Sequence, residues 1–315
     1  MNVVFLFPGY GGQFVGMGKD LYDEHRVLQE FFEEASHCLG INFVKLCFAA
    51  SDSEIAQMPM SYPAIFLLSC ALSALLAEHG ITPTMVAGYD AGIYAALFAA
   101  GGLTFPDGLY IIRKYTEFYE SLRQEKDLGA LEVKKVPSAI LENLCREFET
   151  TQVASYLGND EHVVTGLAGD IELLRTAITQ EVRKARVKSL DPAVGLHSPL
   201  VAPVKKMLDM YLAKVDFHEV QLPCLSTVTG QPMPSDKQSI RDVVLTRLEN
   251  PIHWEKVMEN IQDADVVIAF GPGTKLAQTA RLWYPEKEVF SLNTIRDFDR
   301  IQEFFEEKKA LLHGS

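Results

Sequence analysis

The chain has 315 residues, of which 48% are hydrophobic and 23% are charged, and its formal net charge is −13. This length allows one large and one smaller folded unit. The acidic balance argues against nucleic acid as a main partner, because binding phosphates requires a basic surface. Five cysteines are scattered without metal-ligand spacing, which predicts buried, reduced thiols in a cytoplasmic protein: Cys38, Cys47, Cys70, Cys145 and Cys224.

The first residues predict a short strand rather than a signal peptide, because they lack a cationic start and a long apolar region. We expect no membrane partner, since no run reaches the roughly 18 apolar residues that a membrane-spanning helix needs. Val3 to Phe7 predicts a buried strand that runs into the Gly-rich loop Pro8 to Gln13. Such a strand is typical of a parallel sheet. The backbone N–H groups of the loop could bind an anion, or the loop could be a structural turn without a ligand. It is not a Walker motif, because no Gly-Lys-Ser/Thr follows.

The most informative stretch runs from Val86 to Leu97. It begins with an apolar run, turns between Gly88 and Gly92, and continues as an Ala-rich helix. A strand, a Gly-x-X-x-Gly turn and a helix form a nucleophile elbow, which lifts the middle side chain above the sheet at the helix N-terminus. The middle residue of such an elbow is usually Ser, and here it is Asp90. The sequence therefore predicts that the geometry is kept and the reactive group is changed.

The remaining elements follow in order. Residues 18–56 predict amphipathic helices, and Ser61 to His79 predicts a long apolar helix. From Ala130 to Leu190 the pattern reads strand-helix-strand-strand-helix-strand, which indicates a ferredoxin-like unit. Further on, Val266 to Gly273 predicts another buried strand that ends in a Gly-rich turn. Repeated strand-turn-helix units outside the ferredoxin-like part favour a doubly wound α/β domain.

The main basic cluster of this acidic chain lies at the end of the ferredoxin-like stretch. It holds four cations: Arg183, Lys184, Arg186 and Lys188. A solvated helix end explains many such clusters, but an acidic partner would dock here. Lys205, Lys206 and Arg281 are secondary candidates for the same role.

Five segments, in the right order, carry a resemblance to malonyl-CoA:acyl-carrier-protein transacylases and to the acyltransferase domains of polyketide synthases. The resemblance covers essentially the whole length. The segments correspond to the family's F-P-G-Q-G-S-Q, G-H-S-x-G-E-Y, catalytic-histidine, N-P-V-x-W and V-G-P-G motifs, and they are Phe7–Gln13, Gly88–Tyr94, His197–Leu200, Asn250–Trp254 and Phe270–Gly273.

The resemblance implies an α/β-hydrolase-like large subdomain with a parallel sheet, spanning residues 1–128 and 192–315. The ferredoxin-like small subdomain, residues 129–191, is inserted in it. The family uses a Ser–His dyad with an oxyanion hole of backbone N–H groups. Carried over, His197 matches the catalytic histidine, with a backbone carbonyl near Arg247 holding its ring. Tyr10 and Ala91 supply the oxyanion-hole N–H groups.

Several positions depart from the family's pattern. Asp90 replaces the nucleophilic Ser and Tyr89 replaces the histidine before it. Tyr115 falls where the family's arginine clamps the malonyl carboxylate, and Arg113, two residues away, would point elsewhere on a helix. Tyr62 and Tyr10 replace two site glutamines, while Gln13 is retained in the loop. A malonyl carboxylate thus loses its bidentate partner and meets the like charge of Asp90, which disfavours malonyl transfer.

Three interpretations of the Asp90–His197 pair remain open. Asp90 could attack a thioester, or orient water with His197, and either route leads to hydrolysis. The two groups could instead perform acid/base chemistry, such as dehydration or isomerisation of a β-hydroxyacyl thioester. In the acid/base interpretation the tyrosine hydroxyls would orient a neutral, fairly long acyl chain. The third interpretation is a catalytically inactive scaffold that binds a carrier protein.

The partners follow from the resemblance. We expect a cytoplasmic enzyme of polyketide or fatty-acid biosynthesis that acts in trans on acyl groups carried by acyl carrier protein. Its substrate is an acyl thioester on a phosphopantetheine arm, or on coenzyme A. No tightly bound cofactor and no metal are expected, because no His, Asp or Glu cluster has ligand spacing.

Overall fold

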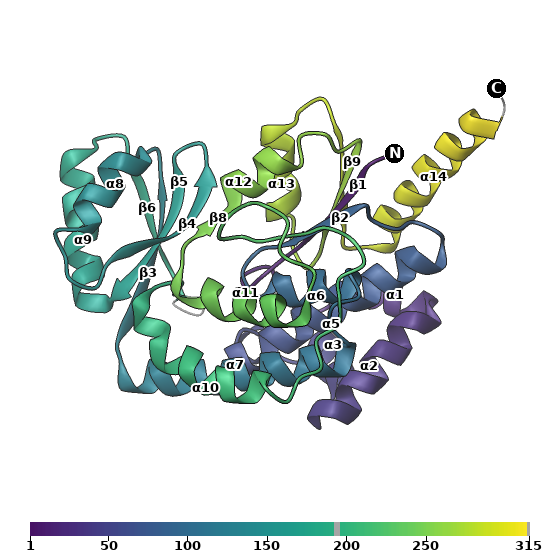
Figure 1. Ribbon diagram of the computed structural model, residues 1–315, viewed down its shortest axis with the longest axis horizontal. Helices are drawn as coiled ribbons and strands as arrows, with labels where there is room; N and C mark the ends of the chain where they lie inside the picture. The colour runs from purple at the N-terminus through teal and green to yellow at the C-terminus, as the bar shows by residue number, and fades with distance from the viewer. Residues whose placement is uncertain (192–195, 314–315) are drawn as a thin grey trace. The chain divides into compact units, whose positions relative to one another are not determined.

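The computed structural model describes residues 1–191 and 196–313 (Figure 1). By its contacts the chain divides into two compact units. The first unit comprises Met1–Ile112, Val220–Cys224 and Ile261–Ser315, and the second comprises Arg113–Glu219 and Leu225–Asn260. Each unit has its own sheet and its own apolar core, so each is described by itself.

The first unit is built on a five-stranded sheet of order β10-β9-β1-β2-β7. Neighbouring strands from β10 to β2 pair in parallel. Its strands are β1 (Val3–Phe7), β2 (Met85–Gly88), β7 (Cys224–Leu225), β9 (Val266–Phe270) and β10 (Glu288–Leu292). Every residue of β1 and β9 is buried, as expected of central parallel strands. The aromatic rings of Phe7 and Phe270 stack between these two strands, with centroids 4.5 Å apart.

Helices supply the other layers of the first unit. They are α1 (Lys19–Glu24), α2 (Arg26–Leu39), α3 (Phe43–Ala49), α4 (Asp52–Ile55), α5 (Met58–Glu78), α6 (Gly92–Ala99), the first part of α7 (Phe105–Glu125), α13 (Lys275–Trp283) and α14 (Ile295–His313). Among them α5 packs against both α2 and α6, and α6 packs on β1 and β2. This arrangement places the N-terminal turns of α5 and α6 close to the carboxyl ends of β1 and β2.

Helix α5 corrects one expectation from the sequence. It is 21 residues long and apolar enough, by length and composition, to cross a bilayer. However, 83% of its most apolar window is buried inside the protein. It is a core helix whose long apolar run is explained by packing on all sides.

The second unit contains the predicted ferredoxin-like motif. Its strands are β3 (Leu128–Lys134), β4 (Gln152–Gly158), β5 (Glu161–Leu167), β6 (Arg186–Leu190) and β8 (Ile252–His253), in the order β6-β3-β5-β4-β8. The β3–β6, β3–β5 and β4–β5 pairs are antiparallel, and β8 joins β4 in parallel. Helices α8 (Ser138–Cys145) and α9 (Ala168–Glu181) pack beside this sheet (Figure 1). Its core includes Leu131, Val164 and Leu174.

The second unit extends beyond the predicted 129–191. It also holds η2 (Pro199–Val201), α10 (Ala202–Leu212), α11 (Lys237–Glu249), α12 (Trp254–Asn260) and the later part of α7. The physical reason is local packing: β8 adds a fifth strand to the small sheet, α12 packs on β4, and Phe118 of α7 meets Tyr211 of α10 with ring centroids 5.2 Å apart. The predicted boundary at residue 192 lies outside the described residues.

The cysteine expectation is correct at four of five positions. Cys47, Cys70, Cys145 and Cys224 are buried free thiols, whereas Cys38 is exposed on α2. Burial in apolar surroundings raises the pKa of Cys47 and Cys145 to about 12, so these thiols stay protonated and inert.

Candidate active site

The predicted elbow is confirmed as a strand, a tight turn and a helix. β2 ends at Gly88 and α6 begins at Gly92, with Asp90 between them at φ 50°. Asp is one of the few residues with a side chain that enters this left-handed region readily. A Cβ atom on Gly92 would lie 2.3 Å from the carbonyl oxygen of Phe7, so only glycine lets the helix approach β1 this closely.

Asp90 is buried, with 1% of its surface exposed, and it is held by a tyrosine. The hydroxyl of Tyr62, in the first turns of α5, donates a hydrogen bond to Asp90 Oδ2 over 3.1 Å. The ring of Tyr10 stacks on that of Tyr62, with centroids 5.7 Å apart and planes at 19°. Tyr10 in turn donates its hydroxyl hydrogen to the carbonyl of Ala56 over 3.1 Å. Two stacked tyrosines therefore fix one oxygen of the carboxylate.

A small hollow, partly open to solvent and with room for about one water molecule, lies beside this pair in the first unit. Its wall combines the β1 loop, α5 and the start of α6, and is formed by Pro8, Gly9, Tyr10, Tyr62, Ile65, Phe66, Ser69, Ala91, Gly92 and Ala95. A Cβ atom on Gly9 would lie 2.8 Å from Asp90 Cβ, which shows how closely the loop approaches the carboxylate. The hollow thus adjoins the candidate reactive group.

Both residues predicted for the oxyanion hole, Tyr10 and Ala91, line this hollow. Ala91 directly precedes α6. The N–H of Gly92 donates to the carbonyl of Tyr89, and the N–H of Ile93 donates to the carbonyl of Asp90. Within residues 1–191 and 196–313 the Ala91 N–H donates no hydrogen bond. An N–H group of this kind at a helix N-terminus is suited to stabilise a developing oxyanion.

Two other predicted pocket residues have different surroundings. Gln13 accepts a hydrogen bond from the Gly11 N–H over 2.9 Å at its Oε1 atom, so its side chain braces its own loop. Tyr89 is half-buried, and its N–H donates to the carbonyl of Phe7. Neither residue belongs to the wall of the hollow.

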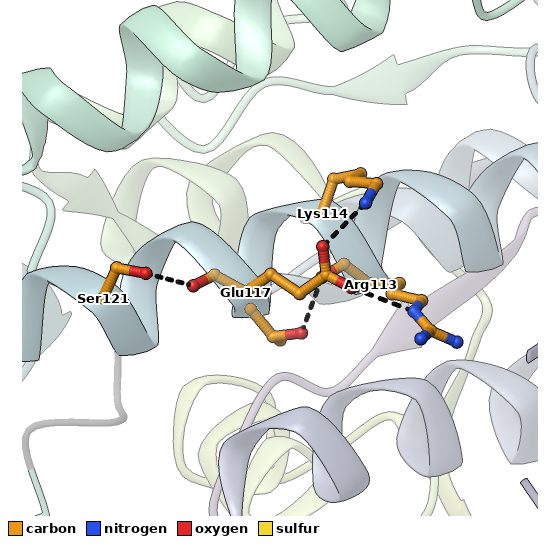
Figure 2. Close-up of polar contacts among 5 residues, drawn as sticks. Arg113, Lys114, Glu117 and Ser121 are labelled. Carbon is orange, nitrogen blue, oxygen red and sulfur yellow. Dashed lines mark hydrogen bonds and ion pairs between the residues drawn. The ribbon is translucent and has the colours of Figure 1, made fainter.

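Tyr115 belongs to the second unit, where it is buried with 1% exposure and its ring lies 5.7 Å from that of Tyr119. Arg113 points elsewhere on the same helix, as the sequence predicted. Figure 2 shows its guanidinium and the Lys114 ammonium beside the carboxylate of Glu117. The Arg113 Nε atom lies 3.0 Å from Oε1, and the Lys114 Nζ atom lies 2.7 Å from Oε2. The Arg113 side chain is 47% exposed. Arg113 therefore belongs to a surface ion cluster with Lys114 and Glu117.

His197 lies in the second unit with 3% exposure and φ 44°. Its Nδ1 is 2.9 Å from the carbonyl oxygen of Arg247. A carbonyl can only accept, so Nδ1 carries a proton in this contact. The side-chain amide of Gln152 donates to the His197 carbonyl over 2.6 Å and helps to hold this strained conformation.

Two positioning contacts in this site were missed by the sequence reasoning. Gln152 was not singled out, and neither was Thr165, whose hydroxyl donates to the carbonyl of Leu196 over 2.6 Å. Both residues lie in strands β4 and β5 and bind backbone atoms across a long sequence separation. No motif signals such a contact. Asp90 belongs to the first unit and His197 to the second, and their pairing stays a prediction.

The four predicted docking cations, Arg183, Lys184, Arg186 and Lys188, are all exposed. The last two belong to β6, which is an edge strand of the second sheet. Lys205 is paired with Glu249, and Arg281 donates to the carbonyl of Val289 over 2.9 Å, whereas Lys206 is exposed. Among the described residues, no group of three His, Cys, Asp or Glu side chains is placed to hold a metal ion.

The class of protein follows from these features together with a family comparison. A family profile described as "Acyl transferase domain" matches residues 4–304. The chain belongs to this acyl transferase family.

Named relatives agree with that assignment. The chain is 29% identical over 286 residues to malonyl CoA-acyl carrier protein transacylase of Bacillus subtilis strain 168, and the match covers 88% of each protein. The crystal structure of malonyl CoA-acyl carrier protein transacylase from Clostridium perfringens has a TM-score of 0.92 at 22% identity, covering 99% of this chain and 100% of that one.

A further solved structure shares the fold. It is a malonyl-transacylase in complex with its type II polyketide synthase acyl-carrier protein, with a TM-score of 0.91 at 22% identity, covering 96% of this chain and 99% of that one. The α/β fold with a parallel sheet and a second, ferredoxin-like sheet is therefore the family's fold.

Proposed function

We propose that this protein acts in trans on acyl groups carried by an acyl carrier protein in fatty-acid or polyketide synthesis, and that it hydrolyses them instead of transferring malonyl groups. The observation that carries the proposal is the buried Asp90 at the tip of the elbow, bound by the Tyr62 hydroxyl. In this proposal the ionisable Asp90 stands in place of the family's serine, and the Tyr62 hydroxyl holds its carboxylate. Decay of an unused site would not supply either feature.

The proposed hydrolysis has two chemical steps. A carboxylate oxygen of Asp90 attacks the thioester carbonyl carbon, the C–S bond breaks, and the pantetheine thiolate leaves and takes a proton from solvent. The product is a mixed anhydride, which water attacks after Nε2 of His197 accepts one of its protons. The tetrahedral oxyanion of each step receives the N–H groups of Tyr10 and Ala91. The overall reaction is acyl thioester plus water to free acid plus thiol.

Malonyl transfer is disfavoured by the residue at position 115. Tyr115 lacks the bidentate guanidinium that holds a carboxylate, and Arg113 is committed to Glu117. The negative charge of Asp90 would also repel a malonate. Acid/base chemistry on a β-hydroxyacyl chain, namely dehydration or isomerisation, uses the same two side chains and is the second candidate.

The carrier protein, an acidic partner, would dock at the basic stretch Arg183 to Lys188. Support comes from the exposure of all four cations, which form no ion pair within the described residues. Charge reversal at Arg183 and Arg186 is expected to weaken carrier binding, and the loss should shrink at high salt. Unchanged affinity would show that the carrier protein does not dock at this surface.

We place the protein in the cytoplasm. We expect no tightly bound cofactor, since the phosphopantetheine arm, or coenzyme A, is part of its substrate.

The deciding experiment is intact-protein mass spectrometry of carrier proteins that bear malonyl, acetyl or β-hydroxyacyl groups, incubated with the wild type, Asp90→Asn and His197→Ala. Asp90-dependent loss of the acyl group supports hydrolysis. Loss of one water with the chain retained supports dehydration, and acyl transfer to a second carrier contradicts the proposal. Intact carrier binding without any change in acyl mass would make the protein a scaffold. A rapidly quenched single turnover in which the mass of the wild type, but not of Asp90→Asn, gains one acyl group would identify the covalent route.

A further inference from the structure

A polar cavity lies at the free edge of the first sheet and shares no residue with the hollow beside Asp90. β10 is the last strand of the order β10-β9-β1-β2-β7, so one side of its backbone pairs with no other strand of that sheet. The cavity has a volume of about 90 Å³, which gives room for several water molecules or one small polyatomic ion. α13, β10 and α14 supply its wall, which consists of Arg281, Glu288, Val289, Phe290, Ser291, Asp297 and Arg300.

Two arginines from different helices belong to this wall. Arg281 lies in the last turn of α13, and Arg300 lies in the second turn of α14. A guanidinium nitrogen of Arg281 donates to the carbonyl of Val289 over 2.9 Å, which holds the group along the strand edge. Within the described residues neither guanidinium forms an ion pair, although Glu288 and Asp297 belong to the same wall. Two unpaired guanidinium groups around one small space favour an anion between them.

The other polar groups of the wall differ in what they have left to offer a ligand. Ser291 Oγ accepts from the side-chain amide of Asn293 over 2.7 Å, so its own hydrogen is left to donate. Asp297 Oδ2 accepts from the N–H groups of Asn293 and Thr294 and from the Thr294 hydroxyl, so this carboxylate braces the start of α14. The Glu288 carboxylate accepts no hydrogen bond within the described residues. The cavity therefore combines several donors with one available acceptor.

We propose that this cavity is a binding site for inorganic phosphate, independent of the chemistry at Asp90. The oxygens of the ion accept hydrogen bonds from Arg281, Arg300 and the Ser291 hydroxyl. Near neutral pH a free phosphate ion also keeps an O–H group, which donates to the Glu288 carboxylate. Sulfate and the dianion of a phosphate monoester have a similar shape but no such hydrogen, so the Glu288 carboxylate repels them.

An extended peptide is the other class of ligand that a free strand edge takes. A peptide strand would need the outward carbonyl of Val289, which Arg281 already occupies. Protection of the edge by a charged side chain explains Arg281. It does not explain Arg300, which donates no hydrogen bond to β10 within the described residues. The contacts therefore favour a small anion over an added strand.

The first test is isothermal titration calorimetry of the full-length protein at pH 8 with phosphate, sulfate and methyl phosphate. Phosphate should bind saturably and about tenfold more tightly than the two ions without a hydrogen. Arg300→Gln should weaken phosphate binding by about tenfold or more, because a charge-assisted donor is lost. Arg296→Gln is the matched control, an exposed arginine of the same helix outside the wall, and should bind like the wild type. Equal weakening in the two variants, or no saturable binding to the wild type, would overturn the proposal.

The second test concerns the choice between the three ions. Glu288→Gln replaces the carboxylate with a neutral amide that also donates, so sulfate and methyl phosphate should bind more tightly and most of the tenfold preference for phosphate should disappear. Glu288 is exposed, so the variant should fold like the wild type. Glu286→Gln, at an exposed position outside the wall, should keep the wild-type preference. An unchanged preference in Glu288→Gln, or methyl phosphate bound as tightly as phosphate by the wild type, would overturn the assignment to inorganic phosphate.

Discussion

The hydroxyl of Tyr62 donates a hydrogen bond to Oδ2 of Asp90 over 3.1 Å, and both side chains are buried. Such a bond to a carboxylate favours its ionised form, because the donor stabilises the charge that burial would otherwise penalise. The resemblance places Asp90 at the family's serine and Tyr62 at one of its glutamines, so the second change would compensate for the first. In the structure the two side chains form one hydrogen-bonded unit.

Tyr62→Phe should therefore weaken Asp90-dependent turnover by roughly tenfold, the equivalent of about 1.5 kcal/mol for a hydrogen bond to a charged group. Loss of the donor also makes the ionised carboxylate less favourable, so the acid limb of the pH–rate profile should move to higher pH. The measurement compares the pH–rate profiles of the wild type and Tyr62→Phe from pH 4 to 8. Tyr22→Phe, an aromatic packing residue elsewhere in the first unit, should keep the wild-type profile. An unmoved acid limb in Tyr62→Phe would show that the bond does not control Asp90.

The positioning of His197 leads to a second prediction. Gln152 donates to the His197 carbonyl and so supports a backbone conformation with positive φ. Gln152→Leu should lower kcat by roughly tenfold with little change in KM, because a small misplacement of the base affects the chemical step most. His197→Ala should eliminate the same step entirely. A Gln152→Leu variant with wild-type kcat would leave the amide without a role in the site.

A third prediction concerns the elbow glycines. Gly92→Ala forces a Cβ to within 2.3 Å of the Phe7 carbonyl oxygen, a backbone atom that cannot move aside. The free energy of unfolding should fall by about 3 kcal/mol, as for severe overpacking. Gly169→Ala near the start of α9 is the control, because no heavy atom lies within 4 Å of the place its methyl group would take. It should be neutral or stabilise the protein by up to about 1 kcal/mol. Urea denaturation of both variants measures the difference.

The sequence alone predicted the elements whose periodicity is strong. β1, β9 and the βαββαβ order of the second unit come from apolar runs and from alternation, which are local signals. The addition of β8 to the small sheet was not predictable, because a two-residue strand has no periodicity and its partner β4 lies far earlier in the chain. The Tyr62–Asp90 contact joins α5 to the elbow across 28 residues, and only the fold brings them together.

Acid sensitivity of the second unit gives a fourth prediction. His162 is buried in β5, and this burial lowers its pKa, while the carboxylates of Asp160, Glu255 and Glu142 oppose the shift. The folded state then binds this proton less readily than the unfolded chain. The free energy of unfolding should fall as the pH drops below about 6.5, the ordinary histidine value, and on through the lowered pKa. His162→Gln should flatten this decline between pH 7 and 5 in urea titrations, whereas His37→Gln, at an exposed position of α2, should not. Equal declines in wild type and His162→Gln would assign the acid sensitivity to other groups.

A serine at position 90 should show which of two features disfavours malonyl transfer: the carboxylate of Asp90 or the missing guanidinium at position 115. Asp90→Ser replaces the carboxylate with a hydroxyl nucleophile beside the proposed oxyanion hole, whose backbone N–H groups the substitution does not remove. The variant should form an acetyl-enzyme from acetyl-pantetheine, visible as one added acetyl group in the intact mass. It should remain poor with malonyl-pantetheine, because Tyr115 offers no guanidinium. The double variant Asp90→Ser/Tyr115→Arg should gain malonyl loading, although an arginine at a position with 1% exposure will reduce stability. Efficient malonyl loading by Asp90→Ser alone would mean that another residue already binds the carboxylate, and Asp90 would then be the sole barrier to the family's reaction.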